Sequence, residues 1–190
     1  QKQILALTNQ VRQEKGVFTL ASVEKLNTSA QYKAEDMALN NYFAHTGNNK
    51  SLANWLADAG YTYQVAGENL AVGFSTAADI VEAWKKSPTH YANLVDNDFK
   101  DLGIGLAGGV YKDQPTVFIV QHFGAPPAAA KVEVESKKVV AKKSSTAEVK
   151  PENKPIAAAV PVESAAAPSS VLAGKIKNDS EAQAPVISTD

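Results

Sequence analysis

Every aromatic residue of this chain lies within residues 1–124, and residues 125–190 contain none. The second part instead holds most of the prolines, together with alanine runs such as residues 128–130. A segment without aromatic side chains cannot easily bury enough apolar surface to offset the conformational entropy that is lost on ordering. We therefore expect one folded domain, residues 1–124, followed by a disordered Pro/Ala/Lys/Ser-rich linker or tail, residues 125–190.

Composition excludes several classes of site. Neither part of the chain carries the basic field that nucleic-acid binding requires. Because there is no cysteine, a disulfide framework, a thiolate nucleophile and a Cys-ligated zinc site are excluded. The sequence shows no transmembrane run and no signal peptide. The tail has the composition of a semi-extended spacer, which could link the domain to an anchor or a partner module.

Hydrophobic periodicity predicts that helices come first and strands last. The predicted helices cover residues 3–15, 22–40, 51–60 and 76–87, and the predicted strands cover residues 65–73, 102–107 and 116–123. Gly108 and Gly109 are expected to form a turn, although Tyr111 could prolong the first strand up to a connection at residues 112–115. Pro88 is expected to leave His90 in a loop or short turn after the fourth helix. This order favours an α+β fold with an antiparallel sheet over a parallel doubly wound one.

Two histidines and two glutamates form the candidate site: His45, Glu68, Glu82 and His90. Imidazole nitrogen and carboxylate oxygen are ligands for a borderline cation such as zinc, and the same groups could share a proton network. The four residues lie on separate predicted elements, so only the fold can bring them together.

Several of these residues also have a purely structural interpretation. Glu82 could form a surface ion pair with Lys85 or Lys86, because these residues are neighbours on one helix face. His45 lies in a loop rich in Gly and Asn and could simply be exposed. His90 could be a turn residue that bonds a backbone carbonyl.

Glu68 is harder to explain as a structural residue. It interrupts an apolar segment, and a buried carboxylate there needs a partner. We expect the third histidine, His122, to be packed at the end of a strand rather than to take part in the site. The sequence has no Gly-x-Ser-x-Gly elbow, no His-Glu-x-x-His helix and no phosphate-binding glycine loop. A hydrolase would therefore need metal-bound water, or a Ser or Thr activated by histidine.

A set of short motifs runs in a fixed order through residues 3–124. They are Asn9-x-x-Arg12, Phe43-Ala44-His45-Thr46, Ala66-Gly67-Glu68-Asn69-Leu70, Ala83-Trp84-x-x-Ser87-Pro88-x-His90-x-x-Asn93-Leu94, Gly103-Ile104-Gly105 and Gln121-x-Phe123-Gly124. This ordered set resembles the CAP superfamily, also called the SCP-like domain, which is named for cysteine-rich secretory, antigen 5 and pathogenesis-related proteins. The resemblance is to the bacterial, cysteine-free branch. Residues 47–51 depart from the family's usual Pro-Asp-Gly-type turn.

The resemblance implies a three-layer α-β-α sandwich with a central antiparallel sheet. It also implies a cleft lined by His45, Glu68, Glu82 and His90, in which the two histidines can hold a divalent ion. Members of the superfamily are usually secreted or attached to the cell surface. They are associated with sterol or lipid binding, signalling, host interaction or proteolysis, so the fold alone does not settle the function.

We therefore expect an extracellular binding module in which His45 and His90 hold a divalent cation. Zinc is the first candidate, and calcium or magnesium are alternatives. Glu68 and Glu82 would tune the histidines through hydrogen bonds, and the ligand would be a lipid, a sterol or another cell-envelope component. One alternative is a metal-dependent, peptidase-like hydrolase with Glu68 or Glu82 as general base. Another is a structural surface protein in which the four residues only share protons.

Overall fold

The computed structural model describes residues 1–127 and 170–178. The elements in these residues are α1 (Lys2–Lys15), β1 (Ala21–Ser22), α2 (Glu24–Leu39), α3 (Leu52–Asp58), β2 (Val65–Val72), α4 (Ala77–Lys86), α5 (Pro88–Val95), β3 (Asp101–Tyr111), β4 (Gln114–Ala125) and β5 (Ser170–Lys177). The strands form one sheet in the order β1-β3-β4-β2-β5. All neighbouring strands are antiparallel except the short β1, which runs parallel to β3.

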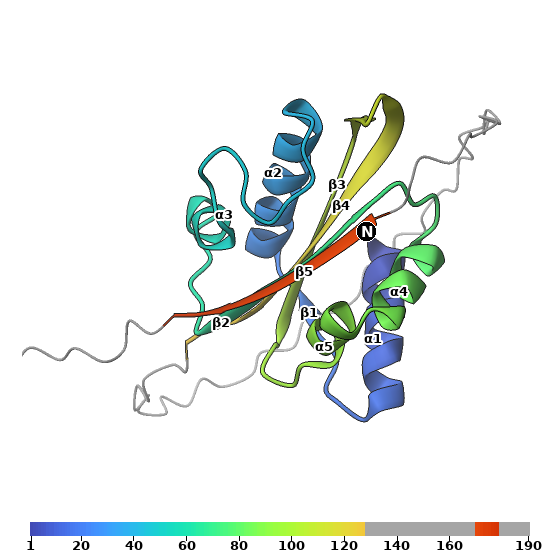
Figure 1. Ribbon diagram of the computed structural model, residues 1–190. Coiled ribbons are helices and arrows are strands. Elements are labelled where there is room, and N and C mark those ends of the chain that lie inside the picture. The colour runs from blue at the N-terminus through green and yellow to red at the C-terminus, as the bar shows by residue number, and fades with distance from the viewer. Residues whose placement is uncertain (128–169, 179–190) are drawn as a thin grey trace, which may run out of the picture. The chain divides into compact units, whose positions relative to one another are not determined.

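Helices cover both faces of this sheet (Figure 1). On β2, Leu70 and Val72 pack in a cluster with residues of α2. Val65 and Ala71 of the same strand pack on the opposite face, in a cluster with residues of α1, α4 and α5. Alternate residues of a strand point to opposite faces, so both faces of β2 are buried. The expected three-layer α-β-α sandwich with a central antiparallel sheet is confirmed.

Two glycines of β3 allow α2 to lie directly on the sheet. A Cβ atom at Gly103 would lie 2.0 Å from the backbone carbon of Leu26, and one at Gly105 would lie 2.2 Å from that of Ala30. No side chain fits at either distance. The Gly-x-Gly pair therefore sets how closely α2 approaches the strands that carry the site.

Pro88 ends α4, as expected, but it also begins another helix. Its fixed φ and missing N–H suit the first position of a helix, and α5 starts there directly after Ser87. The expectation that His90 lies in a loop is therefore wrong. His90 is the third residue of α5 and is buried.

The turn between β3 and β4 lies at the connection after Tyr111 that the sequence allowed, and not at Gly108 and Gly109. Gly108 and Gly109 belong to β3, and the chain reverses at Lys112 and Asp113, whose φ angles are 50° and 62°. Two successive positive φ angles are typical of the tight hairpin turn whose twist matches its strands. Gly109 has a packing role instead, because a Cβ there would lie 2.9 Å from the Cβ of Ala38 on α2.

The segment Ser170–Lys177 corrects the expectation for the tail. It pairs with β2 along eight residues and forms β5, and β4 continues to Ala125, one residue beyond the predicted domain. An aromatic-free segment need not build a core of its own when it can add its backbone and apolar side chains to an existing sheet. The rest of the predicted disordered tail, residues 128–169 and 179–190, lies outside the described residues.

Candidate functional site

A buried carboxylate on β2 lies at the centre of the site. Glu68 is 1% exposed, and it accepts hydrogen bonds from His45 Nδ1 at 2.5 Å and from His122 Nε2 at 2.9 Å. His122 lies directly opposite Glu68 on β4, so both side chains are on the same face of the sheet. Both carboxylate oxygens are therefore engaged by imidazole nitrogens.

These bonds decide the charge of Glu68. Burial alone would raise the pKa of its carboxyl, but the hydrogen bonds from His122 and His45 and their charges outweigh burial and lower that pKa. The carboxylate is therefore ionised at neutral pH. On its far side, His122 Nδ1 lies 2.9 Å from Ser29 Oγ of α2. A continuous chain of hydrogen bonds thus runs from Ser29 through His122 and Glu68 to His45.

His45 is the accessible end of this chain, with a side chain that is 34% exposed. Because the Glu68 carboxylate can only accept hydrogen bonds, the proton of a neutral His45 ring lies on Nδ1. The lone pair of Nε2 is then available to accept a hydrogen bond or to bind a cation. Lys33 of α2 holds the loop that carries His45. Its Nζ donates to His45 O at 3.2 Å and to Tyr42 Oη at 3.1 Å. Burial lowers the pKa of Lys33, and the negative charges of Glu68 and Asp36 partly offset this effect.

His90 approaches from α5 on the other side of β2. Its Nδ1 lies 2.7 Å from Ser87 Oγ, whereas its Nε2 is buried without a well-formed hydrogen bond in the described part of the chain. Burial lowers the pKa of His90, the backbone of Leu172 raises it, and the nearby charge of His45 lowers it further. The two rings are thus close enough to interact electrostatically.

A network of buried amides fixes α5 to the sheet. Asn93 Nδ2 donates to Asn69 Oδ1 at 3.0 Å, and Asn69 Nδ2 donates to Gln121 Oε1 at 3.2 Å and to the His90 carbonyl at 3.4 Å. Gln121 in turn donates to Thr8 Oγ1 of α1 at 2.9 Å. These bonds link the α1, β4, β2 and α5 elements and set the position of His90.

The family model for the Cysteine-rich secretory protein family, CAP, matches residues 5–123. The chain belongs to this family. The matched residues contain every site residue described above except Leu172, and they contain no cysteine in spite of the family's name.

Two proteins of Bacillus subtilis are similar to this CAP chain. The uncharacterized protein YkwD is 34% identical over 117 residues, which are 60% of this chain and 46% of YkwD. The uncharacterized membrane protein YlbC is 36% identical over 107 residues, which are 56% of this chain and 31% of YlbC. The chain thus spans less than half the length of either relative.

Solved structures of two bacterial surface or extracellular proteins have the same fold. An extracellular protein of Bacillus anthracis that contains an SCP domain is 31% identical with a TM-score of 0.55, over 65% of this chain and 39% of that one. An outer surface protein of Borrelia burgdorferi has a TM-score of 0.57 at 22% identity, over 66% of this chain and 91% of that one. Its likeness shows the fold alone. In residues 1–127 and 170–178 we find no helix with the length and apolar character of a membrane span.

The structure does not bring Glu82 to the CAP site. Its half-exposed carboxylate forms ion pairs with Lys85 at 3.2 Å and Lys86 at 3.6 Å, which is the structural alternative that the sequence suggested. The inner face of α4 consists of Ile80, Val81 and Trp84, so the residue between them points outward. His122, which was expected only to pack at the end of a strand, bonds Glu68 instead.

The residues missed by the sequence analysis are His122, Ser29 and Lys33. All three are fully buried. A fully buried Lys in a helix and a His flanked by apolar strand residues are unusual, and each is a signal of a polar partner. The sequence could not identify those partners, because the pairing of His122 with Glu68 depends on the register between β2 and β4.

The donor set limits what ion this site could hold. No group of three or more His, Cys, Asp and Glu side chains in the described ranges is arranged around a metal position. Both oxygens of Glu68 are engaged, so the available protein ligands are the Nε2 atoms of His45 and His90. A cation held by these two imidazoles would need its remaining ligands from water or a bound molecule.

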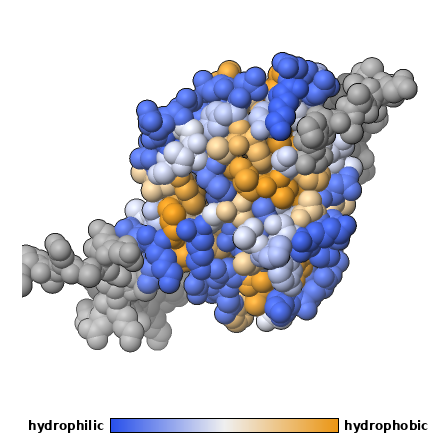
Figure 2. All heavy atoms as spheres, in the orientation of Figure 1, coloured by the Kyte–Doolittle hydropathy of each residue, from blue (hydrophilic) through white to orange (hydrophobic). Residues whose placement is uncertain are grey.

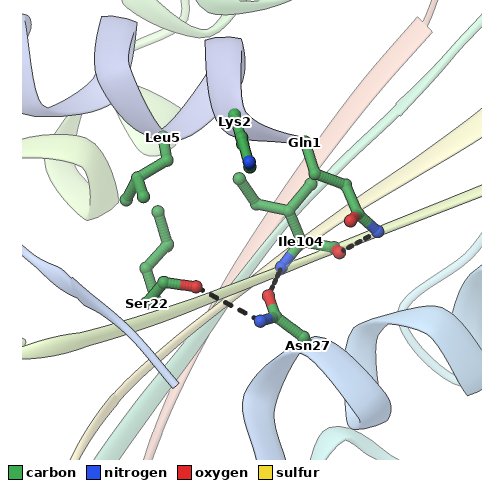
Figure 3. Close-up of a pocket in the computed structure, with 7 residues that line it drawn as sticks. Gln1, Lys2, Leu5, Ser22, Asn27 and Ile104 are labelled. Carbon is green, nitrogen blue, oxygen red and sulfur yellow. Dashed lines mark hydrogen bonds between the residues drawn. The ribbon is translucent and has the colours of Figure 1, made fainter. Parts of the chain in front are cut away.

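A separate small pocket lies between the start of α1 and strands β1 and β3 (Figure 3). It has a volume of about 160 Å³, below the roughly 300–1,000 Å³ of typical ligand sites. Its polar groups satisfy one another, since Gln1 donates to the Ile104 carbonyl, Ile104 N–H donates to Asn27, and Asn27 donates to Ser22. This pocket therefore offers no chemistry that competes with the histidine site.

Proposed function

We propose that this CAP domain is an extracellular binding module whose site takes a divalent cation through His45 and His90. The extracellular location is supported by the Bacillus anthracis relative, which is an extracellular protein at 31% identity. Because the chain spans 39% of that protein, this assignment applies to the domain. We propose a cell-envelope component as the ligand that completes the site.

The observation that carries the cation proposal is that, within the described residues, neither His45 Nε2 nor His90 Nε2 has a well-formed hydrogen bond. His90 Nε2 is buried and has no well-formed hydrogen bond among the described residues, although the backbone of Leu172 lies close enough to raise the pKa of the ring. A cation would satisfy this atom together with His45 Nε2. Glu68 would make His45 a better ligand, because a carboxylate bonded to Nδ1–H orients the ring and raises the basicity of Nε2. Imidazole ligands favour zinc, whereas calcium and magnesium prefer oxygen.

Calorimetric titration of zinc, calcium and magnesium into the full chain tests this proposal. We expect saturable one-to-one binding of zinc that is lost in the double variant His45→Ala/His90→Ala. The matched control is Glu82→Gln, which removes a carboxylate that the structure places outside the site, and its binding should equal that of the wild type. Absence of zinc binding to the wild-type chain at neutral pH would overturn the proposal.

A hydrolase is the second candidate, and the orientation of His45 favours it. An imidazole that donates Nδ1–H to a buried carboxylate and presents Nε2 to solvent is suited to general-base catalysis. In this arrangement His45 is the base and Glu68 orients it, because neither oxygen of Glu68 is free to take a proton from water. Hydrolysis of a peptide library should then be lost in His45→Ala and retained in Glu82→Gln.

A further inference from the structure

The strand β5 occupies the edge of the sheet next to the histidine site. It pairs antiparallel with β2 from Val65 opposite Lys177 to Val72 opposite Ser170. β2 is therefore paired on both sides, by β4 and β5, and all of its residues are buried. Without β5, the edge of β2 would expose a row of unpaired backbone N–H and C=O groups, which readily accept another strand.

Side chains elsewhere in the CAP domain also bind β5, through both its backbone and its side chains. Asn93 Nδ2 of α5 donates to the Gly174 carbonyl at 3.1 Å. Lys175 Nζ forms ion pairs with Asp96 and with Asp98, the latter at 3.3 Å, and lies 5.1 Å above the centre of the Phe99 ring. The domain thus binds the strand through more than the ladder of backbone hydrogen bonds.

The side chains of β5 alternate between the two layers of the sandwich. Leu172 packs against the cluster next to α2, and Ile176 packs against the cluster that includes residues of α3. Val171 packs on the opposite face. Figure 2, in the orientation of Figure 1, shows hydrophobic residues on the face where β5 lies, between hydrophilic borders.

Gly174 lets the strand pass directly over the site. It lies opposite Glu68, and a Cβ atom there would be 3.5 Å from Cε1 of His45. His45 contacts Gly174 on the face of the sheet that α2 covers, whereas Asn93 of α5 donates to the Gly174 carbonyl. A side chain longer than alanine at this position would press on the imidazole ring of His45.

β5 is connected to the strand before it in a different way from the β3–β4 hairpin. β3 and β4 are joined by the two residues Lys112 and Asp113, whereas β4 ends at Ala125 and β5 begins at Ser170. β5 is therefore not joined to β4 by a two-residue turn. Its position depends on the contacts that it makes along β2, and an identical segment supplied separately could make the same contacts.

We propose that the edge of β2 beside His45 is a binding site for an extended polypeptide strand, and that β5 is this chain's own occupant of it. The ligand is a segment with apolar residues at the positions of Leu172 and Ile176, glycine at that of Gly174 and lysine at that of Lys175. Recognition is by strand addition, in which the backbone gives affinity and alternate side chains give specificity. The inference adds a polypeptide ligand to the proposed binding function, and it does not require the cation.

Binding of a labelled peptide to the full chain tests the proposal. The probe is a fluorescein-labelled peptide with the sequence of residues 168–179, measured by fluorescence polarisation with chelator present. The receptor variant is Gly174→Pro/Lys175→Pro. Adjacent residues of an edge strand direct their N–H groups to opposite sides, so one of the two prolines must remove a bond to β2. The matched control, Ser180→Pro/Glu181→Pro, carries the same change after the end of β5.

We expect the Gly174→Pro/Lys175→Pro variant to bind the peptide at least about tenfold more tightly than the wild type or the control. A tethered segment can reach an effective concentration on the order of millimolar, which excludes a dilute competitor. A peptide with valine in place of its glycine should bind more weakly, and this loss should be smaller when the receptor also carries His45→Ala. A folded variant that fails to bind, or that binds a scrambled peptide equally well, would overturn the proposal.

A second measurement uses the wild-type chain and does not depend on how the variant folds. Unlabelled peptide is added in millimolar excess to uniformly ¹⁵N-labelled chain, and the amide signals of Ser170–Lys177 are followed by NMR. Displacement should move these signals to the positions of a free segment and leave those of β4 in place. Signals of β5 that do not move would overturn the proposal. Because chelator is present in both experiments, failure here is distinguishable from failure of the cation proposal.

Discussion

Replacing Glu68 by glutamine tests the hydrogen-bonded group at the centre of the site. Glutamine has the same size as glutamate, but one of its two terminal groups donates hydrogen bonds. In the variant, the amide oxygen can still accept from His45. The amide NH₂ then faces His122, whose ring can accept at Nε2 if it carries its proton on Nδ1 and donates to Ser29 Oγ, 2.9 Å away. Both hydrogen bonds can still form in the variant, but neither histidine is then bonded to a charged carboxylate.

The size of the effect follows from this exchange. Hydrogen bonds to charged groups contribute about 1.5–3 kcal/mol each, compared with about 0.5–1.5 kcal/mol for neutral pairs. Replacing the two bonds of Glu68, at 2.5 and 2.9 Å, by neutral ones predicts a decrease of about 2–3 kcal/mol in the free energy of unfolding at neutral pH. Urea denaturation followed by the fluorescence of the buried residues Trp55 and Trp84 measures it.

The pH dependence of this difference is a sharper test than its size. The folded-state pKa of Glu68 lies below the ordinary value of 4.5, so its carboxylate contributes stability that is fully present above pH 4.5. That contribution is lost as the pH falls through the lower folded-state pKa. The difference between wild type and Glu68→Gln should therefore shrink below pH 4.5, with chelator present throughout.

The control is Glu82→Gln, which makes the same chemical change on an exposed carboxylate. It should leave the free energy of unfolding unchanged within error. Equal stability of Glu68→Gln and wild type at neutral pH would refute the reasoning. So would a loss that remains constant below pH 4.5, because either result means that Glu68 is not an ionised acceptor in the folded chain.

Two further substitutions test the framework of the site by urea denaturation. Gly103→Ala should lower the free energy of unfolding by about 1–3 kcal/mol, because its Cβ would lie 2.0 Å from the backbone of Leu26. Gly108→Ala is the control, since a Cβ there meets nothing within 4 Å. Thr76→Ala should cost about 1 kcal/mol, because it removes the acceptor of the Asp79 N–H bond that caps α4. Thr76→Ser should retain most of that stability.

Local patterns in the sequence were sufficient for most of the architecture. The N-cap residues Ser51 and Thr76 begin α3 and α4 as predicted, because a capping hydroxyl acts within three residues of itself. The strand predicted over residues 116–123 lies within β4, because its pattern also depends only on near neighbours. Glu68 was recognised as a residue that needs a partner, because a carboxylate in a buried strand is costly without one.

Errors arose where a local signal had two possible causes. Gly108 and Gly109 suggested a turn, but Gly109 is small because Ala38 of α2 packs against it. Pro88 ends one helix, but proline also suits the start of the next, which places His90 inside α5. The sequence alone does not say which of these causes applies, because the deciding neighbour lies elsewhere in the fold.

The sequence by itself determined most of the elements, the family and the need of Glu68 for a partner. Only the tertiary structure decided that His122 joins His45 as a partner of Glu68, that Glu82 lies outside the site, and that Ser170–Lys177 is a strand. Each decision depends on pairing between residues that are far apart in the chain: the register of β2 with β4, and the edge of β2 that accepts β5. Periodicity and capping act within a few residues, whereas strand register and edge pairing are settled by which distant backbone groups satisfy one another.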